Sequence, residues 1–174
     1  ADSKSSPKVV GLTSVTNSKF VEDLGCYDEV ISYDQLDKID YSQGAVIVDM
    51  AGNREILGTL HGKLEGNMLK CLTVGMTRWD NETTAEDALG QAMLRERTEF
   101  FFAPAHIQKR IGEWGHEGYA QKTNAFMSKR ALQSNDWMQI KRIIGLEDFT
   151  TTYKEVVAGQ IKPHEGIIVE LKDD

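Results

Sequence analysis

The sequence predicts an α/β domain in which a mostly parallel sheet is flanked by helices. Short apolar, β-branched runs that suit buried strands alternate with longer segments whose apolar residues recur every three or four positions, as in amphipathic helices. Strands separated by helices favour parallel pairing through right-handed crossovers. With 174 residues, 40% of them hydrophobic, the chain can bury one sizeable core but not two full domains.

The first predicted elements are a strand, a helix and a second strand. Residues 8–14 form an apolar run that suits a buried parallel strand. A helix through Leu24 follows, and Gly25 is expected to end it because glycine tolerates a positive φ. Residues 29–33 give the second strand. The candidate caps at the start of the helix are Thr16, Asn17 and Ser18.

A third strand over residues 44–49 leads into the most clearly amphipathic helix. Asn53 is expected to cap this helix after a tight turn. His61 falls outside the expected apolar face and is therefore predicted to be exposed. A fourth strand is predicted over residues 68–77. The apolar face of the helix comprises Ile56, Leu57, Leu60 and Leu64.

The later half of the chain is predicted to be mostly helical. Residues 78–99 are polar and only weakly periodic, which predicts a loop or lid. Three apolar faces with helical spacing follow and are expected to join the core. A last helix over residues 149–157 and a closing strand over residues 166–171 complete the fold. The three faces are formed by Ile107, Ile111 and Trp114, by Tyr119, Thr123, Phe126 and Met127, and by Trp137, Ile140, Ile143 and Ile144.

Composition excludes several classes of function. A formal net charge of −7 with scattered basic residues argues against nucleic-acid binding, which depends on clustered Lys and Arg. No apolar run approaches the roughly 20 residues of a membrane span, so we expect a soluble, cytoplasmic protein. Cys26 and Cys71 lack the spacing of a metal site and are expected to be buried free thiols. No pair among the four histidines supports a metal site either.

Ligand chemistry is expected beyond the carboxyl ends of the strands, where open parallel sheets bind their ligands. At the end of the first strand, where an adenosine ribose would lie, no acidic residue is present to accept from a 2′-hydroxyl. Ser14 and Asn17 can instead donate to a 2′-phosphate and Lys19 can add a positive charge, which favours NADP over NAD. The simpler interpretation, that Asn17 caps a helix and Lys19 faces water, is the commoner one for these residue types.

The next two strand ends are small and polar. Gly52 permits close approach of a ligand, although a tight turn alone would explain it. Gly75 and Thr77 stand at the matching end of the following strand. His106 follows Pro104 at a helix start and is a further candidate for a substrate contact, although a capping or surface role is the more usual one.

Several of these stretches resemble the medium-chain dehydrogenase/reductase superfamily, in its quinone-reductase-like branch. The resemblance rests on residues 9–33, 48–52 and 72–77, whose order and spacing agree with that superfamily. More closely, the chain is similar to an uncharacterised family within it. The residues that carry this closer likeness are Gly-Leu-Thr-Ser at 11–14, Phe-Phe-Ala-Pro at 101–104 and Lys-Arg-Ile-Gly-Glu-Trp-Gly at 109–115.

The resemblance implies a partial Rossmann-like sheet flanked by helices, with a helical C-terminal stretch and a closing strand. It implies that Ser14, Lys19 and Tyr33 hold the adenosine 2′-phosphate of NADP. It also implies that residues 149–171 return toward a catalytic domain. The residues implied to pass along the ribose and nicotinamide are Ala51, Gly52, Gly75, Met76 and Thr77.

A complete member of that superfamily has a catalytic domain and a glycine-rich pyrophosphate turn ahead of the segment that opens this sequence. We therefore expect the C-terminal part of a longer protein, which by itself binds dinucleotide weakly or not at all. The expected divisions are a disordered segment at 1–7, the Rossmann-like portion at 8–80, a loop and helical part at 81–147, and the returning helix and strand at 148–174.

Two functions fit the sequence. One is the cofactor-binding portion of an NADP-dependent oxidoreductase that reduces a quinone, an enone or a carbonyl. Its catalytic residues stay unassigned, because in hydride transfer the cofactor does the chemistry. The alternative is a non-catalytic scaffold or subunit that binds a partner through aromatic residues 100–102 and Trp114. A small-molecule substrate is the expected ligand of the first, and either function is compatible with a homo-oligomer or with association with the remainder of the polypeptide.

Overall fold

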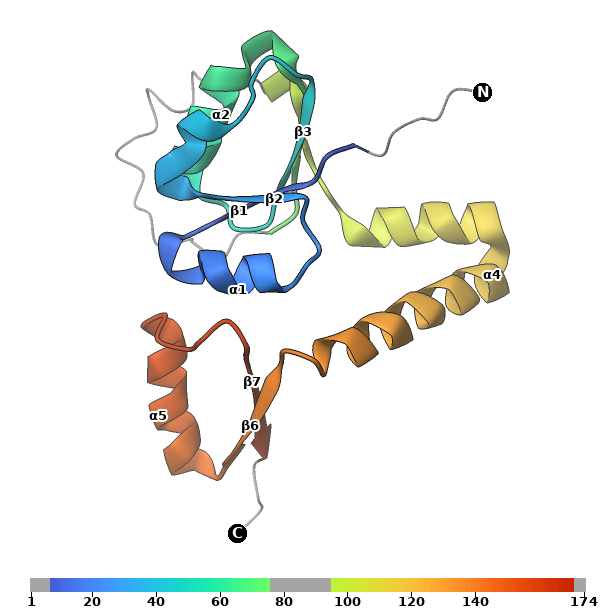
Figure 1. Ribbon diagram of the computed structural model, residues 1–174. Coiled ribbons are helices and arrows are strands. Elements are labelled where there is room, and N and C mark those ends of the chain that lie inside the picture. The colour runs from blue at the N-terminus through green and yellow to red at the C-terminus, as the bar shows by residue number, and fades with distance from the viewer. Residues whose placement is uncertain (1–6, 76–94, 171–174) are drawn as a thin grey trace. The chain divides into compact units, whose positions relative to one another are not determined.

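The computed structural model describes residues 7–75 and 95–170 of the chain (Figure 1). They form two compact units. One, the terminal unit, is made of Ala1–Val30 and Trp114–Asp174, and the other, the central unit, is Ile31–Glu113. The architecture is α/β, with parallel strands in small sheets and helices beside them. In the described ranges we find no helix with the length and apolar character of a membrane span.

The chain begins with the predicted strand, helix and strand. These are β1 (Val10–Thr13), α1 (Ser18–Asp23) and β2 (Glu29–Ser32), with a 3-10 turn at Val15–Asn17 before the helix. β1 and β2 pair in a two-stranded sheet. The backbone N–H of Asp28 donates to the Val9 carbonyl at 2.9 Å, which brings the start of β2 beside the start of β1. Gly25 has a φ of 61° after α1, as its predicted role requires.

The central unit is built on a three-stranded parallel sheet in the order β3–β4–β5. β3 (Ala45–Asp49) is followed by α2 (Arg54–Leu64), which leads through a 3-10 turn at Glu65–Asn67 into β4 (Met68–Thr73). β5 (Thr98–Phe100) is a short strand preceded by a 3-10 turn at Arg95–Arg97. A further 3-10 turn, Tyr33–Lys38, follows β2.

A hydrophobic core lies between α2 and this sheet. Leu57 and Leu64 of the helix meet Met68 and Cys71 of β4, and the last two are completely buried. Three partly buried side chains complete the cluster, from Tyr41, Ala45 and Ile47. This packing covers one face of the sheet, whereas Val46 and Val48, on the other face of β3, are more than half exposed, so β3 is not fully buried as its apolar run predicts.

His61 of α2 corrects the sequence prediction, because its side chain is 1% exposed rather than open to solvent. Leu57, Leu60, His61 and Leu64 occupy positions i, i+3, i+4 and i+7 and thus share one helix face. The predicted face included Ile56 instead, so it was rotated away from the true one and left the histidine outside.

The segment predicted as a loop over residues 78–99 contains part of an element. Thr98 and Glu99 belong to β5, which pairs in parallel with Cys71 and Leu72 of β4. Residues 76–94 lie outside the described residues. The fourth predicted strand, over residues 68–77, ends as β4 at Thr73.

The helical part of the prediction becomes α4 (Ala103–Ser134), which bends at Gly115, where φ is 70°. The first part of α4 belongs to the central unit and the remainder to the terminal unit. The predicted core role of Phe126 and Met127 is wrong, since both side chains are more than half exposed. Phe126 instead lies under the Arg130 guanidinium, 5.3 Å from the ring centroid.

The terminal unit closes with a strand, a helix and a strand. α5 (Leu146–Val157) lies beside the parallel pair of β6 (Gln139–Ile144) and β7 (Glu165–Glu170), as Figure 1 shows. The helical face predicted around Ile140 and Ile143 is wrong, because these residues form β6. Edge contact between Phe20 of α1 and Trp137, with ring centroids 5.6 Å apart, joins the two ends of the chain within this unit.

Candidate functional site

The candidate site is the carboxyl edge of the central sheet, where three loops leave neighbouring parallel strands. Asp49 is in register with Thr73, and Thr73 with Phe100, so β3, β4 and β5 end side by side. Two backbone bonds extend this alignment past the strands: Val74 N–H donates to the Asp49 carbonyl at 2.8 Å, and Phe101 N–H to the Thr73 carbonyl at 2.9 Å. Small ligands bind open parallel sheets at this edge.

The loop after β3 is organised by the Asp49 carboxylate. Its Oδ1 accepts hydrogen bonds from the backbone N–H groups of Ala51 at 3.1 Å and Gly52 at 2.9 Å. Gly52 has a φ of 69°, a conformation that favours glycine. Asn53 then caps α2 as predicted, its Oδ1 accepting from Glu55 N–H and Ile56 N–H. The two bonds to Asp49 thus satisfy the loop amides and fix the backbone of the turn between β3 and α2.

The loop after β4 packs directly against the loop after β3. Gly75 N–H donates to the Asp49 carbonyl at 3.4 Å. A Cβ atom on Gly75 would lie 2.7 Å from the Met50 carbonyl oxygen, which is too close for any side chain. The structure thus brings together Ala51, Gly52 and Gly75, three of the predicted cofactor residues. The contact with Met50 by itself explains why position 75 is a glycine, with no ligand required. The predicted Met76 and Thr77 lie outside the described residues.

Tyr33, the other predicted cofactor residue of the central unit, stands apart from these loops in the sequence. It follows β2 directly and begins the 3-10 turn Tyr33–Lys38, where its side chain is partly buried.

Ser14, Asn17 and Lys19 belong to the terminal unit, at the end of β1. The Ser14 carbonyl accepts from Asn17 N–H at 3.0 Å and from the Ser18 hydroxyl at 3.1 Å, so the backbone turns sharply here. Asn17 stands at the cap position of α1, but its side chain makes no capping hydrogen bond. The simple capping interpretation of Asn17 is therefore correct for its position and wrong for its side-chain bond.

Lys19 is exposed, and its ammonium group pairs with the Asp23 carboxylate one helical turn later. The hydrogen bond to Asp23 raises the pKa of Lys19 above its ordinary value, so the side chain is fully charged at neutral pH. To meet a phosphate, the ammonium group has to leave Asp23. Such exposed pairs are weak, so the exchange costs little.

The third loop of the carboxyl edge, between β5 and α4, contains Phe101, which contacts a histidine in the first turn of α4. The imidazole of His106 stacks on the Phe101 ring, with centroids 4.3 Å apart and an interplanar angle of 26°. Nearby on β5, Glu99 pairs with Lys70 of β4. That lysine is the main reason why the pKa of Glu99 is lowered, and His106 and Lys109 lower it further.

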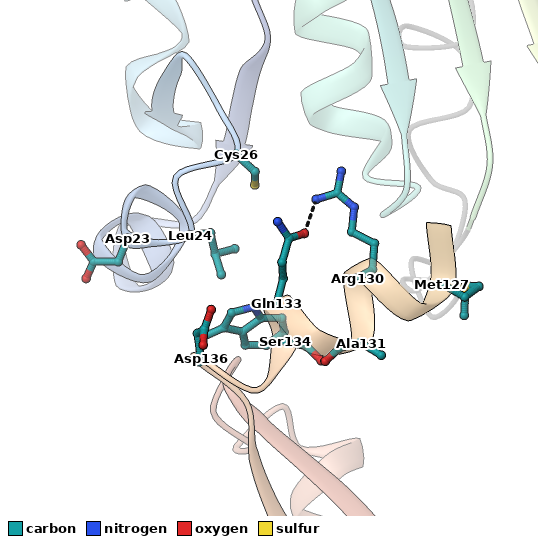
Figure 2. A pocket seen from close by; sticks show the side chains of 10 residues that line it. Asp23, Leu24, Cys26, Met127, Arg130, Ala131, Gln133, Ser134 and Asp136 are labelled. Atoms are coloured by element: carbon teal, nitrogen blue, oxygen red, sulfur yellow. Dashed lines mark hydrogen bonds between the residues drawn. The ribbon is translucent and has the colours of Figure 1, made fainter. Parts of the chain in front are cut away.

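A separate hollow of about 620 Å³ lies within the terminal unit (Figure 2). Leu24 and Cys26, from the end of α1 and the loop after it, face the last turns of α4, where Arg130 donates a hydrogen bond to Gln133 at 2.9 Å. Trp137 also lines the hollow. Among the predicted cofactor residues that the structure describes, none lines it, although Asp23, the partner of Lys19, does.

Cys26 is exposed, contrary to the prediction that both thiols are buried. It follows Gly25 in the loop before β2. Cys71 is buried as predicted, and desolvation is the main reason why its pKa is raised.

Sequence reasoning missed two interactions of this site, that of the Asp49 carboxylate with the loop amides and the stacking of His106 on Phe101. The segment from Asp49 to Asn53 was expected to meet a ligand, but the carboxylate itself was given no role, although an aspartate at the start of a tight turn can accept from the loop amides. The stacking of Phe101 and His106 could have been suspected from the aromatic run before Pro104. In the part of the chain that the structure describes, no three His, Cys, Asp or Glu side chains converge in a way that would hold a metal ion.

The chain belongs to a protein family of unknown function (DUF2855), whose family model matches residues 1–162. No curated protein matches the sequence.

Proposed function

We propose that this chain carries the cofactor-binding part of an NADP-dependent oxidoreductase, of the kind that reduces a quinone, an enone or a carbonyl. The observation that carries the proposal is the carboxyl edge of the central sheet. There two neighbouring parallel strands end in the close-packed loops of Gly52 and Gly75, and α2 begins directly beside them. This is the position at which open α/β sheets receive nucleotides.

The choice of NADP over NAD rests on the terminal unit. None of the residues that follow β1 in the turn, 14–18, is acidic. The turn carries instead the hydroxyl of Ser14, the amide of Asn17, which makes no capping bond, and the charged Lys19. Hydroxyl and amide donors with a nearby cation suit a 2′-phosphate. The role of Tyr33 at the 2′-phosphate, in contrast, rests on the resemblance alone. The substrate class follows from the resemblance alone.

Binding of NADPH to the complete protein, with this chain in its natural context, is the first test. A ligand that binds only the native state raises its stability, by about 2.7 kcal/mol at a hundred times the dissociation constant. Thermal unfolding monitored by circular dichroism, with and without millimolar NADPH, should therefore give a higher midpoint with the cofactor. An unchanged midpoint, together with unchanged NADPH fluorescence, would contradict the proposal.

Replacing Lys19 tests the cofactor preference. Lys19→Ala should weaken NADPH binding about tenfold and leave NADH binding nearly unchanged, because only NADPH has the 2′-phosphate. Lys63→Ala is the matched control, since Lys63 forms a comparable exposed pair with Asp37. Titration of each variant with both cofactors by calorimetry is the measurement. Equal weakening for NADPH and NADH would remove Lys19 from the 2′-phosphate site.

The second candidate function is a non-catalytic scaffold or subunit. The observation that favours it is the exposure of three aromatic side chains in the described chain: Phe100 is 66% exposed, Phe102 56% and Trp114 41%. Exposed aromatic residues often mark protein interfaces. If NADPH produces no stabilisation and replacing Phe100 and Phe102 by serine abolishes self-association in sedimentation velocity, this second function takes precedence.

A further inference from the structure

The turn after β1 and the helix that follows it contain a single basic side chain. Lys19 is the only basic residue between Lys8 and Lys38 in the sequence. It lies in the first turn of α1, shortly after Ser14 and Asn17, and its side chain is 78% exposed. Within this segment, an anion that binds beside the turn can receive positive charge only from Lys19.

Lys19 already has an anionic partner within α1. Its ammonium group forms an ion pair and a hydrogen bond with the Asp23 carboxylate, whose side chain is also exposed. The hydrogen bond with Asp23 is the largest influence on the pKa of Lys19 and raises it, whereas the Glu22 carboxylate acts only by longer-range attraction. A phosphate that binds to Lys19 therefore has to compete with Asp23 for the same ammonium group.

The other two carboxylates between Lys8 and the end of the terminal unit's first stretch, at Val30, have different partners. Asp28 accepts a hydrogen bond from the Val9 N–H at 2.7 Å. Glu29 pairs with Lys8 at 2.6 Å. Both interactions lie at the starts of β1 and β2, whereas α1 follows the end of β1. In this segment the two carboxylates of α1 are therefore the ones that act on its lysine.

The ion pair in α1 is of a kind that a ligand can open. Both side chains are exposed, and exposed ion pairs contribute little to stability. In addition, the lysine precedes the acid by four residues, which is the less favourable order for such a pair in a helix. A carboxylate in this arrangement should weaken the binding of a phosphate to Lys19 without abolishing it.

We propose that Asp23 is a specificity-determining residue, which lowers the affinity for a 2′-phosphate by holding the ammonium group of Lys19. The inference rests on the proposed function, because that function assigns the 2′-phosphate to Ser14, Asn17 and Lys19. It adds a positioning residue that acts through Lys19 rather than on the cofactor itself. Removal of the Asp23 charge should therefore increase the preference for the phosphorylated cofactor.

Two adenosine ligands that differ only in the 2′-phosphate measure this effect in the complete protein. Adenosine 2′,5′-bisphosphate carries the 2′-phosphate, and adenosine 5′-monophosphate lacks it. Asp23→Asn keeps the size of the side chain and removes its charge. By calorimetric titration, we expect this variant to bind the bisphosphate about threefold more tightly than the wild type does, the effect of one exposed ion pair. Its affinity for the monophosphate should be unchanged.

Glu22→Gln is the matched control. It removes the same charge from the neighbouring residue, which acts on Lys19 only at longer range, so it should change the affinity for the bisphosphate much less. A double variant, Lys19→Ala with Asp23→Asn, shows whether Asp23 acts through Lys19. Once Lys19 has been replaced by alanine, the additional change at Asp23 should leave the affinity for the bisphosphate unaltered.

The dependence of binding on salt gives a second readout, which a merely structural role of Asp23 would not change. In the wild type the charges of Lys19 and Asp23 cancel, so salt has little to screen between this pair and a phosphate. In Asp23→Asn the lysine charge is no longer balanced by its partner. Raising the NaCl concentration from about 50 to about 300 mM should therefore weaken bisphosphate binding more steeply in this variant than in the wild type.

The two ligands also distinguish failure of this inference from failure of the proposed function. If the wild type prefers the bisphosphate and Asp23→Asn does not increase that preference, the inference is wrong. An equal gain for both ligands, or the same gain in Glu22→Gln, also overturns it, because either result indicates a general effect of charge. If neither the wild type nor Asp23→Asn distinguishes the two ligands, the proposed preference for NADP fails and the role of Asp23 fails with it.

Discussion

At the scale of single residues, the buried histidine of α2 has the clearest physical consequence. His61 is 1% exposed among leucines, and desolvation lowers its pKa below the ordinary value of 6.5. The folded protein therefore holds this side chain neutral at pH values where the unfolded chain takes up a proton. A buried neutral histidine makes the folded state sensitive to mild acid.

We predict that the free energy of unfolding decreases as the pH falls below about 6.5, by at most about 1.4 kcal/mol per pH unit from this one proton. The pKa in the folded state is the lower one, so the unfolded state binds the extra proton and gains stability from it. Above pH 7 both states are neutral at this position and the effect vanishes. Urea denaturation at pH 7.5, 6.5 and 5.5 measures it.

His61→Leu should flatten the dependence over that range, because leucine fills the site and does not titrate. The exposed His116 provides the comparison, since His116→Ala should keep the wild-type slope. A slope that survives in His61→Leu would mean that other groups cause the loss of stability in acid.

The residues of the candidate site differ in how far sequence could predict them. Gly52 and Asn53 act through backbone conformation and local hydrogen bonds, and such short-range roles follow from residue type. The surroundings of Lys19 were harder to predict, because a lysine pairs with whichever carboxylate the helix brings near, and here that carboxylate is Asp23. The contact of His106 with Phe101 depends on the loop after β5, whose strand was not predicted.

At the scale of elements, prediction was correct where pattern and length were both decisive. The 11-residue α2 shows helical spacing of its leucines and a cap, and β3 is a β-branched run, so the existence of both elements follows from sequence. The prediction failed for β6 because its six residues contain three isoleucines whose spacing is compatible with a helix as well as with a strand. Its pairing with β7, from Gln139 with Glu165 to Ile144 with Glu170, decides the matter through partners distant in sequence.

The cap of α2 is the element-scale feature most open to measurement. Asn53→Ala should lower the free energy of unfolding by about 1 kcal/mol, because two backbone N–H groups at the start of α2 lose their acceptor. Asn17→Ala is the matched control, since Asn17 occupies the cap position of α1 without a side-chain capping bond. That change should stay within about 0.5 kcal/mol.

Chemical denaturation of the two asparagine variants against wild type is the measurement. Equal losses of unfolding free energy in the two variants would show that the capping hydrogen bonds of Asn53 contribute nothing measurable to stability.

At the scale of the whole molecule, the two cysteines report on different parts of the fold. Cys26 is exposed in the terminal unit, whereas Cys71 lies in the core of the central unit with a raised pKa. Only the thiolate reacts, so Cys71 is protected both by burial and by its protonation.

We predict that an aromatic disulfide reagent modifies Cys26 rapidly in the native protein and Cys71 more slowly by roughly a thousandfold or more, because Cys71 reacts only when the central unit opens. Absorbance at 412 nm should show one fast and one slow phase. Cys26→Ser should remove the fast phase alone. Two fast phases in the wild type would contradict the buried position of Cys71.

The division of the chain also constrains the order in which it can fold. The central unit is one continuous stretch, so its strands and α2 can come together as soon as Glu113 has been synthesised. The terminal unit combines residues from both sides of that stretch, and Phe20 has to wait for Trp137. Its completion closes a long loop, a step that costs entropy and proceeds more slowly than local pairing. If the central unit folds first, it shortens the effective length of that loop. The terminal unit, whose sequence is interrupted by the central unit, then depends on the central unit for its own assembly.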